Sequence, residues 1–159
     1  MPSQHPTAMT AADDRDEIRT LVHSYADRID RGDIDGVVEL FAHASVVSSE
    51  GHVISGRKML RELWATGLQL YDGSPRTHHL ITNVDVRVSD DGQRATANSY
   101  ATAVQALPGF PLQVIVASRH EDTFEKVNGR WRFAERRDFR DLEGDLSRHF
   151  VLPHRPESD

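Results

Sequence analysis

Apolar side chains recur every three or four positions through the first half of the chain, a spacing that predicts amphipathic helices. From Asp13 the apolar stripe runs through Ile18, Val22 and Ile29, and Gly32 is expected to end this first helix. The remainder of this half predicts further helices at 34–41 and 58–70, with short extended segments at 44–48 and 52–55.

The second half of the chain changes to a period of two, which is typical of β-strands that have one covered face. Turn-forming pairs, among them Asp91-Gly92 and Asn128-Gly129, separate the apolar runs. Long strands are expected at 80–88, 95–106, 112–126 and 131–141.

Helices that precede a run of hairpins predict an α+β fold with segregated layers, because parallel strand–helix–strand units would need helices between the later strands. A curved antiparallel or mixed sheet wrapped by three helices would leave a cone-shaped cavity, which is the natural pocket. The 159 residues suit one domain, expected at 13–152, with disordered tails at 1–12 and 153–159.

Composition narrows the function classes. The chain has no cysteine, which excludes disulfides and thiolate chemistry, and its net charge of -6 disfavours nucleic acid as a partner. The histidines match no metal-ligand spacing, and no phosphate loop or dinucleotide fingerprint is present, so we expect neither a metal nor a cofactor. Without a signal-peptide core or an apolar run that could span a bilayer, the protein is expected to be cytoplasmic, with no membrane partner.

Two aspartates of the first helix lie on different faces. Asp27 points away from the apolar stripe and can pair with Arg31, a surface interaction worth ~0.3–0.5 kcal/mol. Asp30 lies at the edge of the stripe, about 110° from its centre, so it either bonds a neighbouring loop or faces the pocket. Tyr25, near the middle of the stripe, is either a core aromatic or a pocket hydroxyl, and when buried it needs a partner.

Charged residues also occur where a strand should have an inward face. His78 and His79 adjoin the first long strand, so only one imidazole is expected to point inward. Charge is crowded over 136–141, where an ion-pair ladder on the outer face is the usual explanation. An inward arginine here would need a buried partner, and Asp30 is a candidate for that role.

Three segments carry a resemblance to a known family: 25–35 in the first helix, 76–81 before the first long strand, and the closing hairpin 128–133. They resemble the SnoaL-like superfamily, also called ketosteroid-isomerase-like or nuclear transport factor 2-like, over about Asp13 to Val151. The chain is most similar to the branch with scytalone dehydratase, bile-acid 7α-dehydratase and hexachlorocyclohexane dehydrochlorinase, which are cofactor-free lyases. This resemblance implies a cone-shaped, cystatin-like α+β barrel.

The resemblance also implies site residues. The family's catalytic Asp–His pair falls on Asp30 and His79, and Tyr25 lies where the bile-acid enzyme has a pocket tyrosine. Pocket arginines of the bile-acid enzyme and the dehydrochlorinase fall on Arg140 and Arg136, respectively, which are expected to bind substrate.

There are departures from the pattern of this branch. The second catalytic histidine of scytalone dehydratase falls on Tyr100, which is then expected to contact substrate. The second aspartate of the bile-acid enzyme falls near Val104. The substrate of neither enzyme is therefore carried over to this chain.

The expected chemistry follows from these assignments. With Asp30 bonded to one ring nitrogen, His79 would remove a proton made acidic by a carbonyl or a leaving group, and water would leave across the adjacent bond. Tyr25 would hydrogen-bond the oxygen that gains charge, and Arg140 would hold an anionic end. Trp64 and Ser118 are further expected contacts, and the apolar helix faces predict a small hydrophobic ring, such as a polyketide, steroid or aromatic catabolite.

Two other functions remain open. An isomerase or polyketide cyclase would use the same base but return the proton to another carbon or close a ring. A non-catalytic ligand-binding domain would use Asp30 and His79 only to support one another in the core. For each of these functions a homodimer or homotrimer is expected. The outer face of the sheet carries valine and isoleucine, and related proteins form such oligomers.

Overall fold

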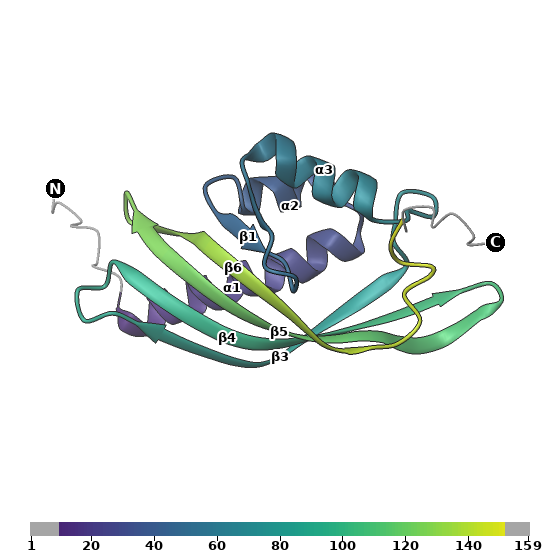
Figure 1. Cartoon of the computed structure of the whole chain (residues 1–159). Helices are drawn as coiled ribbons and strands as arrows, with labels where there is room; N and C mark the ends of the chain where they lie inside the picture. Colours follow the sequence, from purple (N-terminus) through teal and green to yellow (C-terminus); the bar gives the residue numbers. More distant parts are fainter. Residues whose placement is uncertain (1–9, 152–159) are drawn as a thin grey trace, which may run out of the picture.

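The computed structural model describes residues 10–151 as helices followed by a long antiparallel meander (Figure 1). Of the tails predicted at 1–12 and 153–159, residues 1–9 and 153–159 lie outside the described residues, whereas residues 10–12 form the cap and the first turn of α1. No helix within residues 10–151 is long and apolar enough to cross a membrane. The elements are α1 (Ala11–Asp30), α2 (Ile34–Leu40), β1 (Ser45–Val47), β2 (Val53–Ser55), α3 (Arg57–Gly67), β3 (Thr77–Val88), β4 (Arg94–Leu107), β5 (Phe110–Val127) and β6 (Arg130–Glu143).

The first helix begins two residues before the predicted start at Asp13. The Thr10 hydroxyl accepts a hydrogen bond from the Asp13 backbone N–H at 3.2 Å, and the Asp13 carboxylate accepts one from the Thr10 N–H at 2.8 Å. This capping box satisfies N–H groups that the first turn would leave unpaired. The predicted end is confirmed at Gly32, whose φ of 73° and close approach to the Gly73 carbonyl leave no room for a side chain.

The sheet has six strands in the order β2-β1-β6-β5-β4-β3, and only β1 and β6 pair in parallel. Register shifts interrupt the β3–β4, β4–β5 and β5–β6 ladders, and such bulges bend strands. All three helices lie on the concave side of the curved sheet, and α1 packs along β3 (Figure 1). The predicted α+β class, with a mixed curved sheet wrapped by three helices, is confirmed.

The hydrophobic core fills one part of the concave face. It joins Ile18 and Val22 of α1 to Ala97, Phe124 and Phe133 of the sheet. A second, smaller apolar cluster, of Ala103, Phe110, Ile115 and Val116, lies further along β4 and β5. Asp30 and His79 meet at the end of α1 and the start of β3, and the cavity described below borders both clusters, because Trp64 and Val116 line it.

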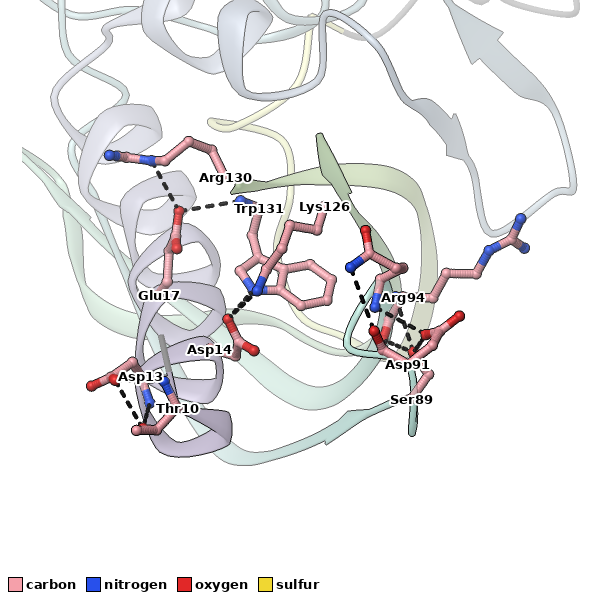
Figure 2. Close-up of polar contacts among 11 residues, drawn as sticks. Thr10, Asp13, Asp14, Glu17, Ser89, Asp91, Arg94, Lys126, Arg130 and Trp131 are labelled. Atoms are coloured by element: carbon pink, nitrogen blue, oxygen red, sulfur yellow. Dashed lines mark hydrogen bonds and ion pairs between the residues drawn. The ribbon is translucent and has the colours of Figure 1, made fainter. Parts of the chain in front are cut away.

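A buried aspartate fixes the start of α1 to the β5–β6 hairpin (Figure 2). Asp14 is 5% exposed and accepts hydrogen bonds from Lys126 Nζ at 2.6 Å and Trp131 Nε1 at 2.9 Å. On the next turn, the Glu17 carboxylate accepts a bond from the Trp131 backbone N–H at 3.2 Å. The helix therefore meets the hairpin through paired polar groups as well as apolar packing.

Replacing Asp14 with alanine should lower the free energy of unfolding by about 3 kcal/mol, because it leaves the largely buried Lys126 ammonium without its partner. Urea denaturation measures this change. The matched control is Asp16→Ala, which removes an exposed pair with Arg19 and should cost less than about 1 kcal/mol. Equal losses for the two variants would contradict a structural role for the buried pair.

Candidate active site

A cavity of about 430 Å³ lies between the concave face of the sheet, α1, α3 and the segment that follows β6. Its apolar walls include Ile29, Ile54, Leu63, Val116 and Phe150. Its polar walls bring together side chains from distant parts of the chain: Tyr25, His79, Ser118, His120, Arg136, Asp138, Arg140 and His149.

Two other concavities, of about 590 and 490 Å³, lack this convergence. The first lies over β3–β6 around Thr96 and Phe124 and contains no histidine. The second is confined to the polar face of α1 between Asp16 and Asp27. Mutually bonded acid and base groups occur in the 430 Å³ cavity, which we therefore take as the candidate site.

Asp30 and His79 meet at the end of α1 and the start of β3. The two oxygens of Asp30 accept hydrogen bonds from His79 Nδ1 at 2.6 Å and from the His79 backbone N–H at 2.7 Å. Thr77, two residues earlier on the same face of β3, donates its hydroxyl to Asp30 at 2.8 Å. His78 is exposed, so one imidazole of the pair points inward, as strand alternation predicts.

The surroundings of Asp30 favour its ionised form. Burial raises the pKa of the Asp30 carboxyl, but hydrogen bonds and charge from His79, with the Thr77 hydroxyl, outweigh it and lower the pKa below its usual value. An ionised Asp30 accepts the Nδ1 proton of His79 and fixes that tautomer. The free Nε2 of His79 is then available as a base, since the ring borders the cavity.

Tyr25 lies between two imidazoles. Its ring centroid is 6.0 Å from that of His79 and 6.1 Å from that of His120. Burial raises the pKa of the Tyr25 hydroxyl to about 12, against the opposing charge of Arg136, whose guanidinium lies 4.5 Å from the ring centre. Tyr25 is therefore a neutral phenol at physiological pH and can donate a hydrogen bond into the cavity.

Arg136 points inward, but the predicted pairing with Asp30 is wrong. Its Nε and Nη2 donate to the two oxygens of Asp122, each at 2.8 Å, and both residues are buried. The reason is strand register: Arg136 on β6 lies directly opposite Asp122 on β5. The guanidinium also packs 5.2 Å from the Phe133 ring centre, so its charge is held within the wall.

The sequence reasoning missed a second histidine–carboxylate pair. His120 Nε2 lies 3.3 Å from Asp138 Oδ1, across the β5–β6 ladder. Burial, reinforced by the Arg136 charge, lowers the pKa of His120, so the ring is neutral. Burial raises the pKa of Asp138, but the His120 hydrogen bond and neighbouring positive charges lower it overall. The signal was present, because Val116, His120 and Phe124 share one parity on β5.

Of the other predicted binding residues, three line the cavity and one lies outside it. Trp64 and Ser118 line the cavity, and so does Arg140, whose Nη2 is bonded to Glu50 at 2.6 Å. The prediction that Tyr100 belongs to the site is wrong. It is 48% exposed and lies outside the cavity, because Ala101, its neighbour on β4, takes the inward position.

The segment after β6 contributes a third imidazole, His149, which is 4% exposed. Burial, with a smaller contribution from His79 and opposed by Asp30, lowers the pKa of His149 from 6.5 to about 4. Within residues 10–151, no group of three or more His, Asp or Glu side chains is arranged to hold a metal ion.

The depressed pKa of His149 predicts acid sensitivity. Between pH 6.5 and 4 the unfolded chain binds a proton at this histidine that the folded chain does not, so stability falls as the pH drops through this window. The loss should approach roughly 3 kcal/mol near pH 4. Thermal melts of His149→Phe should show less loss over the same range, whereas His78→Phe on the exposed face should follow the wild type. A parallel pH profile for His149→Phe would contradict this assignment.

Comparison with known proteins matches the model of the SnoaL-like domain family to residues 10–137. No curated protein matches the chain. Among solved structures, an NTF2-like protein with a cystatin-like fold from Novosphingobium aromaticivorans is 22% identical, with a TM-score of 0.69 over 86% of each chain. A protein of unknown function from Mycobacterium tuberculosis is 26% identical, with a TM-score of 0.68 over 84% of this chain and 78% of that one. A candidate scytalone dehydratase from N. aromaticivorans is 19% identical, with a TM-score of 0.65 over 82% and 85%.

Proposed function

The chain belongs to the SnoaL-like domain family, and from that premise we propose that it is a cofactor-independent lyase of the dehydratase type. Its substrate would be a small hydrophobic ring compound, and Asp30 and His79 would act together as the general base. The observation that carries the proposal is the 2.6 Å contact of Asp30 with His79 Nδ1 beside a largely apolar cavity. The similarity to a candidate scytalone dehydratase is in keeping with it.

The proposed reaction begins when His79 Nε2 takes a proton from a carbon next to a carbonyl. The electron pair of the broken C–H bond forms a C=C bond, and the C–O bond to a neighbouring hydroxyl breaks. The departing hydroxide takes up a proton, which the His79 imidazolium can return, and leaves as water. Asp30 stabilises the imidazolium formed in between, as a carboxylate does in other histidine-based pairs.

Tyr25 is suited to donate the hydrogen bond that this reaction needs at the carbonyl oxygen. Its phenol stays protonated, since its pKa is about 12, and its hydroxyl can hydrogen-bond the carbonyl oxygen as negative charge develops there. A positioned base contributes roughly 10²–10⁴-fold, so orientation of the ring by Trp64 and the other apolar walls must supply the remainder.

The test is to incubate the protein with cyclic β-hydroxy ketones of one to four rings and to follow loss of one water by mass spectrometry. His79→Gln should lower kcat roughly 10²–10⁴-fold, because the base is removed. His78→Gln is the matched control: it changes the adjacent, exposed imidazole and should keep wild-type rates. Circular dichroism of both variants checks that the fold is kept.

The outcomes separate the rival functions. A product of unchanged mass whose formation depends on His79 would replace the dehydratase with an isomerase or cyclase. Ligand binding with no turnover would indicate a non-catalytic binding domain, and equal rates for both glutamine variants would refute the base assignment. A homodimer or homotrimer stays a prediction, for which exposed Leu112, Val114 and Leu142 offer apolar surface.

A further inference from the structure

His149 has no place in the proton transfer proposed above, yet it lies beside it. Its ring centroid is 6.5 Å from that of His79, and its side chain borders the same cavity. On its other side the ring packs 4.6 Å from the Phe150 ring. A substrate that contacts His79 would therefore also meet His149.

The backbone around His149 is fixed from three directions. The Gln69 N–H donates to the His149 carbonyl at 2.8 Å, and the Gln69 side chain donates to the Phe150 carbonyl at 2.7 Å. The neighbouring Arg148 carbonyl accepts bonds from the Tyr71 hydroxyl at 2.8 Å and from Gln105 Nε2 at 3.0 Å. The backbone that carries the imidazole is thus fixed before any ligand binds, which reduces the entropy lost on binding.

The ring itself lacks the hydrogen bonding that a buried polar group normally has. His149 Nδ1 is buried and has no hydrogen-bond partner in the described part of the chain. Most buried polar atoms in folded proteins do have a partner in the protein or in bound water. Nε2 also bonds no described residue and, unlike Nδ1, it is not sealed from the cavity that the ring borders, so it is the ring nitrogen that a bound group can reach.

The charges around the cavity favour an uncharged ligand. Each of its two arginines is already paired within the described chain: Arg136 with Asp122, and Arg140 with Glu50 and Glu143. Asp30 and Asp138 add negative charge beside their histidines. A carboxylate brought into this space would lose its hydration and find both of these cations compensated. This argues against the expected role of Arg140 as an anchor for an anionic substrate end.

We propose that His149 hydrogen-bonds an uncharged oxygen of the substrate, a hydroxyl or a ketone on the ring, and that the cavity rejects carboxylated analogues. The proposal rests on the function proposed above, since it takes the same cavity as the substrate site. It adds a specificity-determining residue and restricts the substrate to a neutral, oxygenated ring compound.

Binding of three probes to the intact chain tests this without any turnover: 2-naphthol, naphthalene and 2-naphthoate, by equilibrium dialysis at pH 7. Wild-type protein should bind 2-naphthol roughly 3- to 10-fold more tightly than naphthalene, as one hydrogen bond implies, and should bind 2-naphthoate most weakly. His149→Phe should abolish the preference for 2-naphthol over naphthalene. His78→Phe, on the exposed face, should keep it.

A second variant tests the charge argument. Glu50→Gln combined with Glu143→Gln removes both carboxylates that pair with Arg140 and should raise the affinity for 2-naphthoate several-fold, with little effect on 2-naphthol. Tight binding of 2-naphthoate to the wild type, an unchanged 2-naphthol preference in His149→Phe, or no binding of any probe would overturn the proposal. If His149→Phe fails to fold, the ranking of the three probes on the wild type still decides it. A failed lyase assay with an intact ranking on the wild type refutes the reaction and leaves the subsite standing.

Discussion

The carboxylate of Asp30 is the contact on which the candidate site depends. It joins the last turn of α1 to the first residues of β3 through bonds from Thr77 and from the backbone and ring of His79. A negative charge at the C-terminal end of a helix is mildly unfavourable, because the carbonyl ends of the peptide dipoles already carry partial negative charge there. The bonds from β3 compensate for this, so the helix end, the strand and the tautomer of His79 are fixed together.

A second constraint comes from the β5–β6 ladder, which carries charge on its concave face. Arg136 lies opposite Asp122, and Asp138 lies opposite His120, so each buried charge meets its partner across the same pair of strands. Isolated buried charges would cost several kcal/mol each. The pairing lets a polar wall continue directly from the hydrophobic core, and its shape is set by strand register.

The periodicity of the sequence was enough to predict the α+β class, the helices and the strands, because burial of one face controls both spacings. The same geometry placed Asp30 at the edge of the helix stripe and one of His78 and His79 inward. Register was not predictable, since the partner of Arg136 is decided by how residues 14 positions apart align across a turn. Tyr100 was misplaced because the family resemblance was followed against the alternation of β4, which turns Ala101 inward. The start of α1 was missed because the Thr10 cap lies before the first apolar position.

The three imidazoles of the cavity differ in the partners of their ring nitrogens, and these differences favour one of them as the proposed base. His79 gives Nδ1 to Asp30 and keeps Nε2 free, with the carboxylate stabilising the proton it gains. His120 has the opposite arrangement: Nε2 faces Asp138, and the remaining Nδ1 is buried without access to a ligand. His149 bonds no carboxylate in the described chain, and its low pKa makes it a weak base. The fold thus places three similar rings around one space, and their different partners support the proposed assignment of proton abstraction to His79 and of hydrogen bonding to His149.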